Sequence, residues 1–145
     1  MVQFQHSVVI AKPVPQVFSY LADFNNNTKW SPDIVEVAKT SPGPNGTGST
    51  WKQVISARNR RMEYAITVDQ FEADRKFHFK GVGGVLDYEV GVAFEPAAGG
   101  TKVTVSPKGQ TKGLVGALFR GTIEKNFQEA LTSSLNNLKK VLEGG

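Results

Sequence analysis

Three kinds of hydrophobic periodicity follow one another along the chain, and their order constrains the fold more than any single motif. Residues 2–10 alternate apolar and polar side chains, which is typical of a half-buried strand. Helical spacing of apolar residues follows in two short stretches, 14–21 and 23–30, the first introduced by prolines that suit an opening helical turn. Residues 33–107 return to period two, and the chain then ends on one long helical repeat.

The middle of the chain indicates six short strands joined by tight turns. Turn-forming residues gather at 41–46, 58–61, 81–84 and 97–100, between runs that alternate apolar and polar side chains. Short connections of this kind predict an antiparallel meander. After Pro107 an apolar stripe at helical spacing, from Ile123 to Leu142, predicts an amphipathic helix of about 20 residues or more with one face to bury.

The widths of these elements do not match. One helix is about 10 Å wide, and strands lie about 4.8 Å apart, so a single helix cannot cover a flat seven-stranded sheet. We therefore expect one α+β domain over residues 1–145, with a seven-stranded antiparallel sheet curved around the long C-terminal helix and two short helices after the first strand. The space left between helix and sheet is a natural place for a ligand.

Composition excludes several classes of protein. The chain has 39% hydrophobic and 21% charged residues, which is typical of a folded domain, and its lack of cysteine excludes disulfides and thiol chemistry. The net charge of +4 is small, and the Arg58, Arg60 and Arg61 cluster is interpreted as a solvated hairpin tip, so no nucleic-acid partner is expected. No segment is apolar enough to span a membrane or has the form of a signal peptide, so we expect a cytoplasmic protein without membrane insertion.

Large aromatic and aliphatic side chains share the inward phase of the predicted strands. A solid core and a ligand cavity both fit this pattern; on the cavity hypothesis these side chains bind the ligand, since small-molecule sites are mostly apolar with few polar groups. The candidate ligand-binding residues are Trp30, Trp51, Gln53, Ile55, Met62, Tyr64, Ile66, Phe77, Phe79, Tyr88, Val90, Phe119, Ile123 and Phe127.

Three of the inward positions carry groups that could move protons. His6 shares the phase of Val8, and an imidazole titrates near neutral pH, so His6, Tyr64 and Tyr88 are the candidate catalytic residues. The alternative for His6 is a neutral histidine bonded within the core. His78 falls on the outward phase and is expected at the surface. The two histidines lie on distant strands, so no metal site is predicted, and no other cofactor is expected.

The order of elements resembles the START/Bet v1-like superfamily with its helix-grip fold, and most of all its polyketide cyclase/dehydrase-type branch. The motifs that carry the resemblance are Pro-Val-Pro-Gln-Val-Phe-Ser-Tyr-Leu at 13–21, Ala-Asp-Phe at 22–24 with Lys-Trp-Ser-Pro at 29–32, Gly-Ser-Thr-Trp at 48–51, Phe-Glu-Pro at 94–96 with Gly-Gly-Thr-Lys-Val-Thr-Val at 99–105, and Leu-Phe-Arg at 118–120 leading to Leu-Lys-Lys-Val-Leu-Glu at 138–143. This resemblance implies an internal ligand cavity and leaves the chemistry open.

Three functional hypotheses remain open from the sequence. The first is a carrier or sensor that binds a small hydrophobic molecule such as a lipid, a polyketide or an aromatic compound. The second is a cyclase or dehydratase that acts on a polyketide-like substrate without a cofactor. The third is a protein-interaction role through the curved sheet or the apolar segment 113–121, for which Leu114 and Phe119 are the test positions. The sequence does not determine the oligomeric state.

Overall fold

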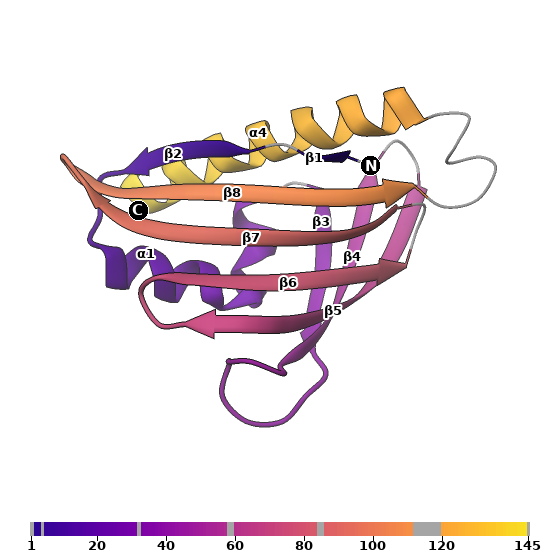
Figure 1. Ribbon diagram of the computed structural model, residues 1–145, viewed down its shortest axis with the longest axis horizontal. Helices are drawn as coiled ribbons and strands as arrows, with labels where there is room; N and C mark the ends of the chain where they lie inside the picture. Colours follow the sequence, from indigo (N-terminus) through magenta and orange to yellow (C-terminus); the bar gives the residue numbers. More distant parts are fainter. Residues whose placement is uncertain are drawn as a thin grey trace.

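One antiparallel sheet makes up most of the molecule (Figure 1). The computed structural model describes residues 2–3, 5–31, 33–57, 60–83, 86–111 and 120–144. Within them the strands follow the order β1-β8-β7-β6-β5-β4-β3, and β2 also pairs with β8. Their bounds are β1 (Val2–Gln3), β2 (His6–Ile10), β3 (Ile34–Lys39), β4 (Thr50–Ala57), β5 (Arg60–Glu72), β6 (Lys76–Gly83), β7 (Leu86–Ala97) and β8 (Gly100–Thr111).

The expected first strand is present in two pieces. Gln3 pairs with Lys108 and His6 pairs with Val105, so β1 and β2 keep one common register on β8. That register places Pro107 of β8 opposite the break, and proline has no N–H to donate to a neighbouring strand. β8 itself continues through Pro107 to Thr111, beyond the strand end expected at residue 107. The sheet thus has seven strand positions, which confirms the predicted seven-stranded α+β fold.

Four helical segments accompany the sheet in the described part of the chain: α1 (Val14–Ala22), the 3₁₀ helix η1 (Phe24–Asn26), α2 (Asn27–Trp30) and α4 (Arg120–Gly144). The second of the two expected short helices is therefore a 3₁₀ turn followed by one α-helical turn. The Asp23 side chain accepts a hydrogen bond from the Asn25 N–H at 3.1 Å and so caps the beginning of η1.

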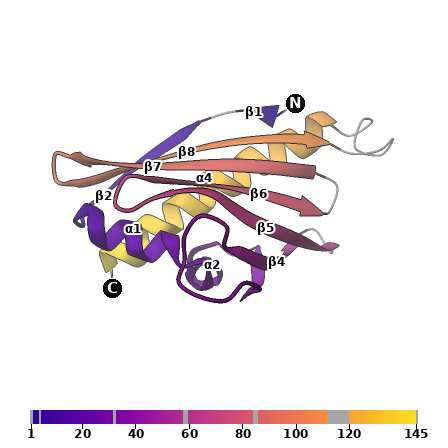
Figure 2. The same ribbon diagram turned by 60° about the horizontal axis from the view of Figure 1, so that its bottom comes forward.

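The sheet curls strongly towards its β3–β4 end. Figure 1 shows β3 and β4 running steeply across the direction of β5 to β8, and Figure 2 shows α4 passing along the sheet with α1 and α2 beside its C-terminal half. The inward stripe of α4 supplies Leu135, Leu138 and Leu142 to the core, where Leu138 and Ile10 of β2 have no exposed surface. The curl and the short helices together give the single long helix enough neighbours to bury its apolar stripe.

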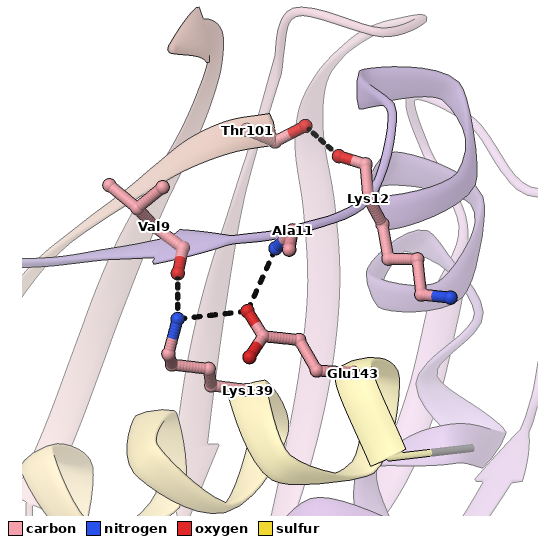
Figure 3. Close-up of polar contacts among 6 residues, drawn as sticks. All are labelled: Val9, Ala11, Lys12, Thr101, Lys139 and Glu143. Atoms are coloured by element: carbon pink, nitrogen blue, oxygen red, sulfur yellow. Dashed lines mark hydrogen bonds and ion pairs between the residues drawn. The ribbon is translucent and has the colours of Figure 1, made fainter. Parts of the chain in front are cut away.

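Polar contacts fix the C-terminal end of α4 to the chain between β2 and α1 (Figure 3). The Lys139 ammonium donates to the Val9 carbonyl at 2.5 Å and pairs with the Glu143 carboxylate at 2.8 Å. The same carboxylate accepts the Ala11 N–H at 2.8 Å. These contacts hold the pKa of Glu143 below its ordinary value, Lys139 being the largest cause and the Ala11 N–H the next.

The β7–β8 turn packs closely against the end of β2. A β-carbon at Gly100 would lie 1.9 Å from the Ile10 carbonyl oxygen, so this position needs a glycine.

We expect Leu138→Ala to lower the free energy of unfolding by about 2–5 kcal/mol, because it leaves a cavity in a fully buried part of the core. Val141→Ala, on the same helix but 36% exposed, should cost less than about 0.5 kcal/mol. Urea unfolding followed by circular dichroism measures both. Equal losses in the two variants would contradict this arrangement of α4.

Glu143→Gln should lower stability at neutral pH and have no effect in acid. Because the folded-state pKa is lowered, the carboxylate stabilises the fold above its ordinary value of 4.5, and that contribution is lost as the pH falls through the folded pKa. Melting temperatures of both proteins at several pH values provide the measurement. Glu129→Gln, exposed on the same helix, is the matched control, and a deficit that is independent of pH would exclude the ion pair as its cause.

Candidate ligand-binding site

The inner face of the sheet is filled by phenylalanines at the end near the β5–β6 and β7–β8 turns. The strand register places Phe71 opposite Phe77 on this face. Phe18 of α1 packs edge-on against Phe71, Phe77 and Phe94, with ring centroids 5.4, 6.0 and 5.0 Å away. Phe18, Phe77 and Phe94 are buried and Phe71 is half-buried, so this end of the interior is a core of closely packed rings.

The opposite end of the same face combines large side chains with glycines. Tyr88 of β7 lies between Gly81 of β6 and Gly109 of β8 in the register, and Tyr64 of β5 lies opposite Gly83. A β-carbon at Gly81 would be 2.5 Å from Cζ of Tyr88, so the Tyr88 ring lies directly across the Gly81 backbone. The missing side chains leave room for the tyrosine rings, which contact each other edge-on with centroids 5.1 Å apart.

Solvent reaches the inner face at this end. Ile55, Met62, Phe79 and Tyr88 occupy inward positions of β4 to β7 and pack against the core, but each is only half-buried. Apolar side chains that point into a fold and still keep exposed area are typical of the wall of a binding site rather than of a filled core. These four residues define what we call the open end.

Four uncharged polar side chains meet at the open end. The Asn27 Nδ2 donates to the Gln53 Oε1 at 3.2 Å, and both residues are more than nine-tenths buried. Gln53 also hydrogen-bonds the Tyr88 hydroxyl, while Tyr64 contacts the Tyr88 ring and donates to the Met62 sulfur at 3.9 Å. Burial raises the pKa of Tyr88 far above its ordinary value of 10.0, with the charge of Tyr64 a smaller cause and the Gln53 contact acting in the opposite direction. Tyr88 is therefore a neutral phenol at physiological pH.

A second polar seam joins α2 to α4. The Ser31 and Ser134 hydroxyls are 3.1 Å apart and buried. Beside them Trp30 packs on the core, and its Nε1–H is buried without a hydrogen-bond partner among the described residues, as is the Tyr20 hydroxyl. Asn27 and Trp30 of α2, with its C-cap residue Ser31, thus place polar groups between the sheet and the long helix.

His6 lies away from the open end. It pairs with Val105 of β8, whereas Tyr88 is opposite Gly109 with β8 between them, so the two residues are roughly 16 Å apart along the sheet. His6 is half-buried on the inward phase, as the sequence predicts. Tyr64 and Tyr88 come together, but the register does not bring the imidazole to them. A catalytic role of His6 stays a prediction.

The remaining predicted binding residues fall into three groups. Trp30, Gln53, Ile55, Met62, Phe79 and Tyr64 surround the open end or adjoin it through Tyr88 and α2, while Trp51, Ile66, Phe77 and Val90 are buried in the core, 9% exposed or less. Trp51 stacks on Phe24 at 5.3 Å. Ile123 and Phe127 lie on α4, but their side chains are outside the described residues, as are Phe119 and nearly all of segment 113–121.

Asn27 was missed by the sequence analysis although a signal was present. It lies three residues from Phe24 and from Trp30, so helical spacing places it on their buried face. His78 was expected at the surface; it is on the outer face, but half-buried, with Nδ1 2.5 Å from Asp69 and Nε2 3.6 Å from Glu89. Alternation along one strand gives the face of a side chain but not its partners on neighbouring strands.

The described residues hold no group of three or more histidine and acidic side chains that could bind a metal ion. In the same part of the chain, no helix has the length and apolar character needed to cross a membrane. Of the predicted arginine tip, Arg61 is exposed and forms an ion pair with Glu36 at 3.0 Å.

Tyr88→Phe should remove a hydrogen bond and also reduce the pH dependence of the free energy of unfolding. At neutral pH we expect a loss of about 1 kcal/mol in the free energy of unfolding, because Gln53 loses a partner. Above pH 10.0 the unfolded chain ionises this tyrosine and the folded protein does not, so the native protein loses stability as the pH rises and the variant loses less. Urea unfolding between neutral pH and about pH 11 tests this, and parallel pH profiles would contradict a Tyr88 that stays neutral in the folded protein.

Comparisons with known proteins agree with this architecture. Residues 1–143 match the family model described as polyketide cyclase / dehydrase and lipid transport. Among solved structures, a START superfamily protein from Mycobacterium smegmatis superposes with a TM-score of 0.84 at 16% identity, covering 99% of each chain. A protein from Thermus thermophilus gives 0.82 at 18% identity, covering 95% of this chain and 94% of that one.

Another matching structure is a two-domain protein from a biosynthetic pathway. The di-domain ARO/CYC StfQ from the steffimycin biosynthetic pathway gives a TM-score of 0.77 at 16% identity, covering 99% of this chain and 50% of that one. Among curated proteins no sequence matches this chain. At these identities the structural matches establish the fold, and the family model covers nearly every residue. This chain belongs to the polyketide cyclase / dehydrase and lipid transport family.

Proposed function

We propose that the protein binds a small hydrophobic molecule against the inner face of its sheet, at the open end, as a carrier or sensor. The observation that carries the proposal is the partial exposure of the inward side chains Ile55, Met62 and Phe79. Covering such apolar surface contributes about 25 cal/mol per Å² before the costs of association. The family description, which includes lipid transport, supports the same class of function.

A cyclase or dehydratase is the second candidate. The family description and the likeness to the ARO/CYC protein StfQ favour it, as does the pair of tyrosines beside Gln53. An enzyme of this kind needs a group that accepts a proton near neutral pH. Burial raises the pKa of Tyr88, which suits a hydrogen-bond donor and not a base, and His6 lies roughly 16 Å away along the sheet. Binding therefore remains the first proposal.

Met62→Glu should weaken ligand binding by about tenfold or more, because a carboxylate at the open end is costly to cover with an apolar ligand. Ala65→Glu is the matched control, since Ala65 is exposed on the outer face of the same strand. Titration with the uncharged fluorescent probe N-phenyl-1-naphthylamine measures both affinities, and circular dichroism checks folding. The proposal fails if the native protein does not bind the probe, or if the two variants bind it equally.

A further inference from the structure

One row of inward positions crosses the sheet at the open end, and two of its members are glycines. Along the row the register pairs, in turn, Trp51 of β4, Ile66 of β5, Gly81 of β6, Tyr88 of β7 and Gly109 of β8. Trp51 and Ile66 fill the β4 and β5 positions and are buried. From Gly81 to Gly109, Tyr88 is therefore the one residue whose side chain the row sends into the interior.

The Tyr88 side chain lies across the strand beside its own. A β-carbon at Gly81 would be 2.5 Å from Cζ of the ring, 2.8 Å from Cε1 and 2.8 Å from the hydroxyl oxygen. Farther along, the ring meets Tyr64 of β5 edge-on, and the hydroxyl hydrogen-bonds Gln53 of β4. The side chain thus extends from β7 over β6 as far as β5 and β4.

Several contacts together hold the Tyr88 ring in this position. Its centroid is 5.1 Å from that of Tyr64 and 6.4 Å from that of Phe79, and both rings are close to perpendicular to it, at 63° and 85°. Gln53, which bonds the hydroxyl, is itself held by Asn27 at 3.2 Å. Packing and a supported hydrogen bond fix the rotamer of a side chain. Tyr88 is therefore a fixed part of the floor of the open end.

A fixed ring on the inner face limits how deep an apolar ligand can reach. Protein interiors are packed as densely as organic crystals, so ligand atoms and ring atoms cannot share space. A ligand at the open end meets Tyr88 before it reaches the Gly81 backbone, because the ring already lies against that backbone. Conversely, a cavity left by a large apolar side chain can bind a small apolar molecule. The position of the ring therefore determines how much of a ligand the site can cover.

We propose that Tyr88 sets the upper size limit of the ligand, and that Gly81 allows the ring to lie where it does so. The inference rests on the proposed binding function. It assigns compact apolar molecules to the native protein, since each carbon atom that would have to pass the ring adds no further affinity. Longer molecules gain the covered length only when the ring is removed.

A homologous series of ligands measures this limit. Straight-chain primary alcohols from hexanol to dodecanol are titrated against the N-phenyl-1-naphthylamine complex of the native protein. Each methylene group that becomes buried should raise the affinity about fourfold. We expect this rise to stop at one chain length within the series, the breakpoint, where the alcohol reaches Tyr88. A rise that continues unchanged through dodecanol would overturn the inference.

Two substitutions of Tyr88 separate its ring from its hydroxyl. Tyr88→Ala removes the ring, so the breakpoint should move to a longer alcohol. Tyr88→Phe keeps the ring and loses only the hydrogen bond to Gln53, so its affinities can change but its breakpoint should stay at the native chain length. An unchanged breakpoint in Tyr88→Ala would overturn the inference, and so would an equal shift in both variants.

Gly81→Ala tests the same contact while the tyrosine is kept. Gly81 does not have a positive φ, so its backbone accepts alanine, but the added carbon would push the ring off the strand and into the interior. The breakpoint should move to a shorter alcohol, and the same change made in Tyr88→Ala should have no effect. Gly91→Ala is the matched control, because its β-carbon would make only an ordinary contact of 3.6 Å with His78 on the outer face.

Circular dichroism checks the folding of each variant, and Gly81→Ala carries the test if Tyr88→Ala does not fold. An unchanged breakpoint in Gly81→Ala, or an equal shift in Gly91→Ala, would contradict the role given to the ring. If no alcohol displaces the probe from the native protein, the proposed binding function fails as well. If the alcohols bind but the breakpoint does not respond to Tyr88 or Gly81, binding stands and the inference alone fails.

Discussion

The wide sheet and the single long helix do not match in width, and most of the structure depends on this mismatch. Seven strand positions present an apolar inner face, and α4 is the one long helix among the described residues that covers it. The sheet curls, and α1 and η1 fill part of the remaining space through Phe18 and Phe24. Figure 2 shows α1 beside α4. What these elements leave uncovered is the open end, where inward apolar side chains keep exposed surface. The binding that we propose would thus be a consequence of how the core is closed.

The distribution of residue sizes decides which end stays open. At one end rings pack on rings, with Phe18 touching three other phenylalanines. At the other end glycines stand opposite the tyrosines, so the same register brings together fewer side-chain atoms. The fixation of the α4 C-terminus through Lys139 and Glu143 lies beside the solid end, near β2 and α1 (Figure 3). The contacts that fix α4 and the site that we propose for a ligand therefore lie at different ends of the sheet.

Family membership and site chemistry answer different questions about this protein. The match over residues 1–143 places the chain in a family whose description covers both catalysis and lipid transport. Fold alone does not choose between the two. Burial raises the pKa of Tyr88, and His6 lies roughly 16 Å away along the sheet, which is why binding remains the first of our two proposals. The side chains of the site therefore say more than the fold does about which of the two functions applies.

The sequence by itself determined the element order, the inward phase of Met62, Tyr64 and Tyr88, and the need for a curved sheet, because periodicity and element widths are local properties of the chain. Tertiary structure decided which inward residues line the open end and which, like Trp51 and Ile66, fill the core. It also brought Asn27 to Gln53 and separated His6 from Tyr88. Register and strand curvature set these distances, and both depend on pairings between residues far apart in the sequence, which no local pattern encodes.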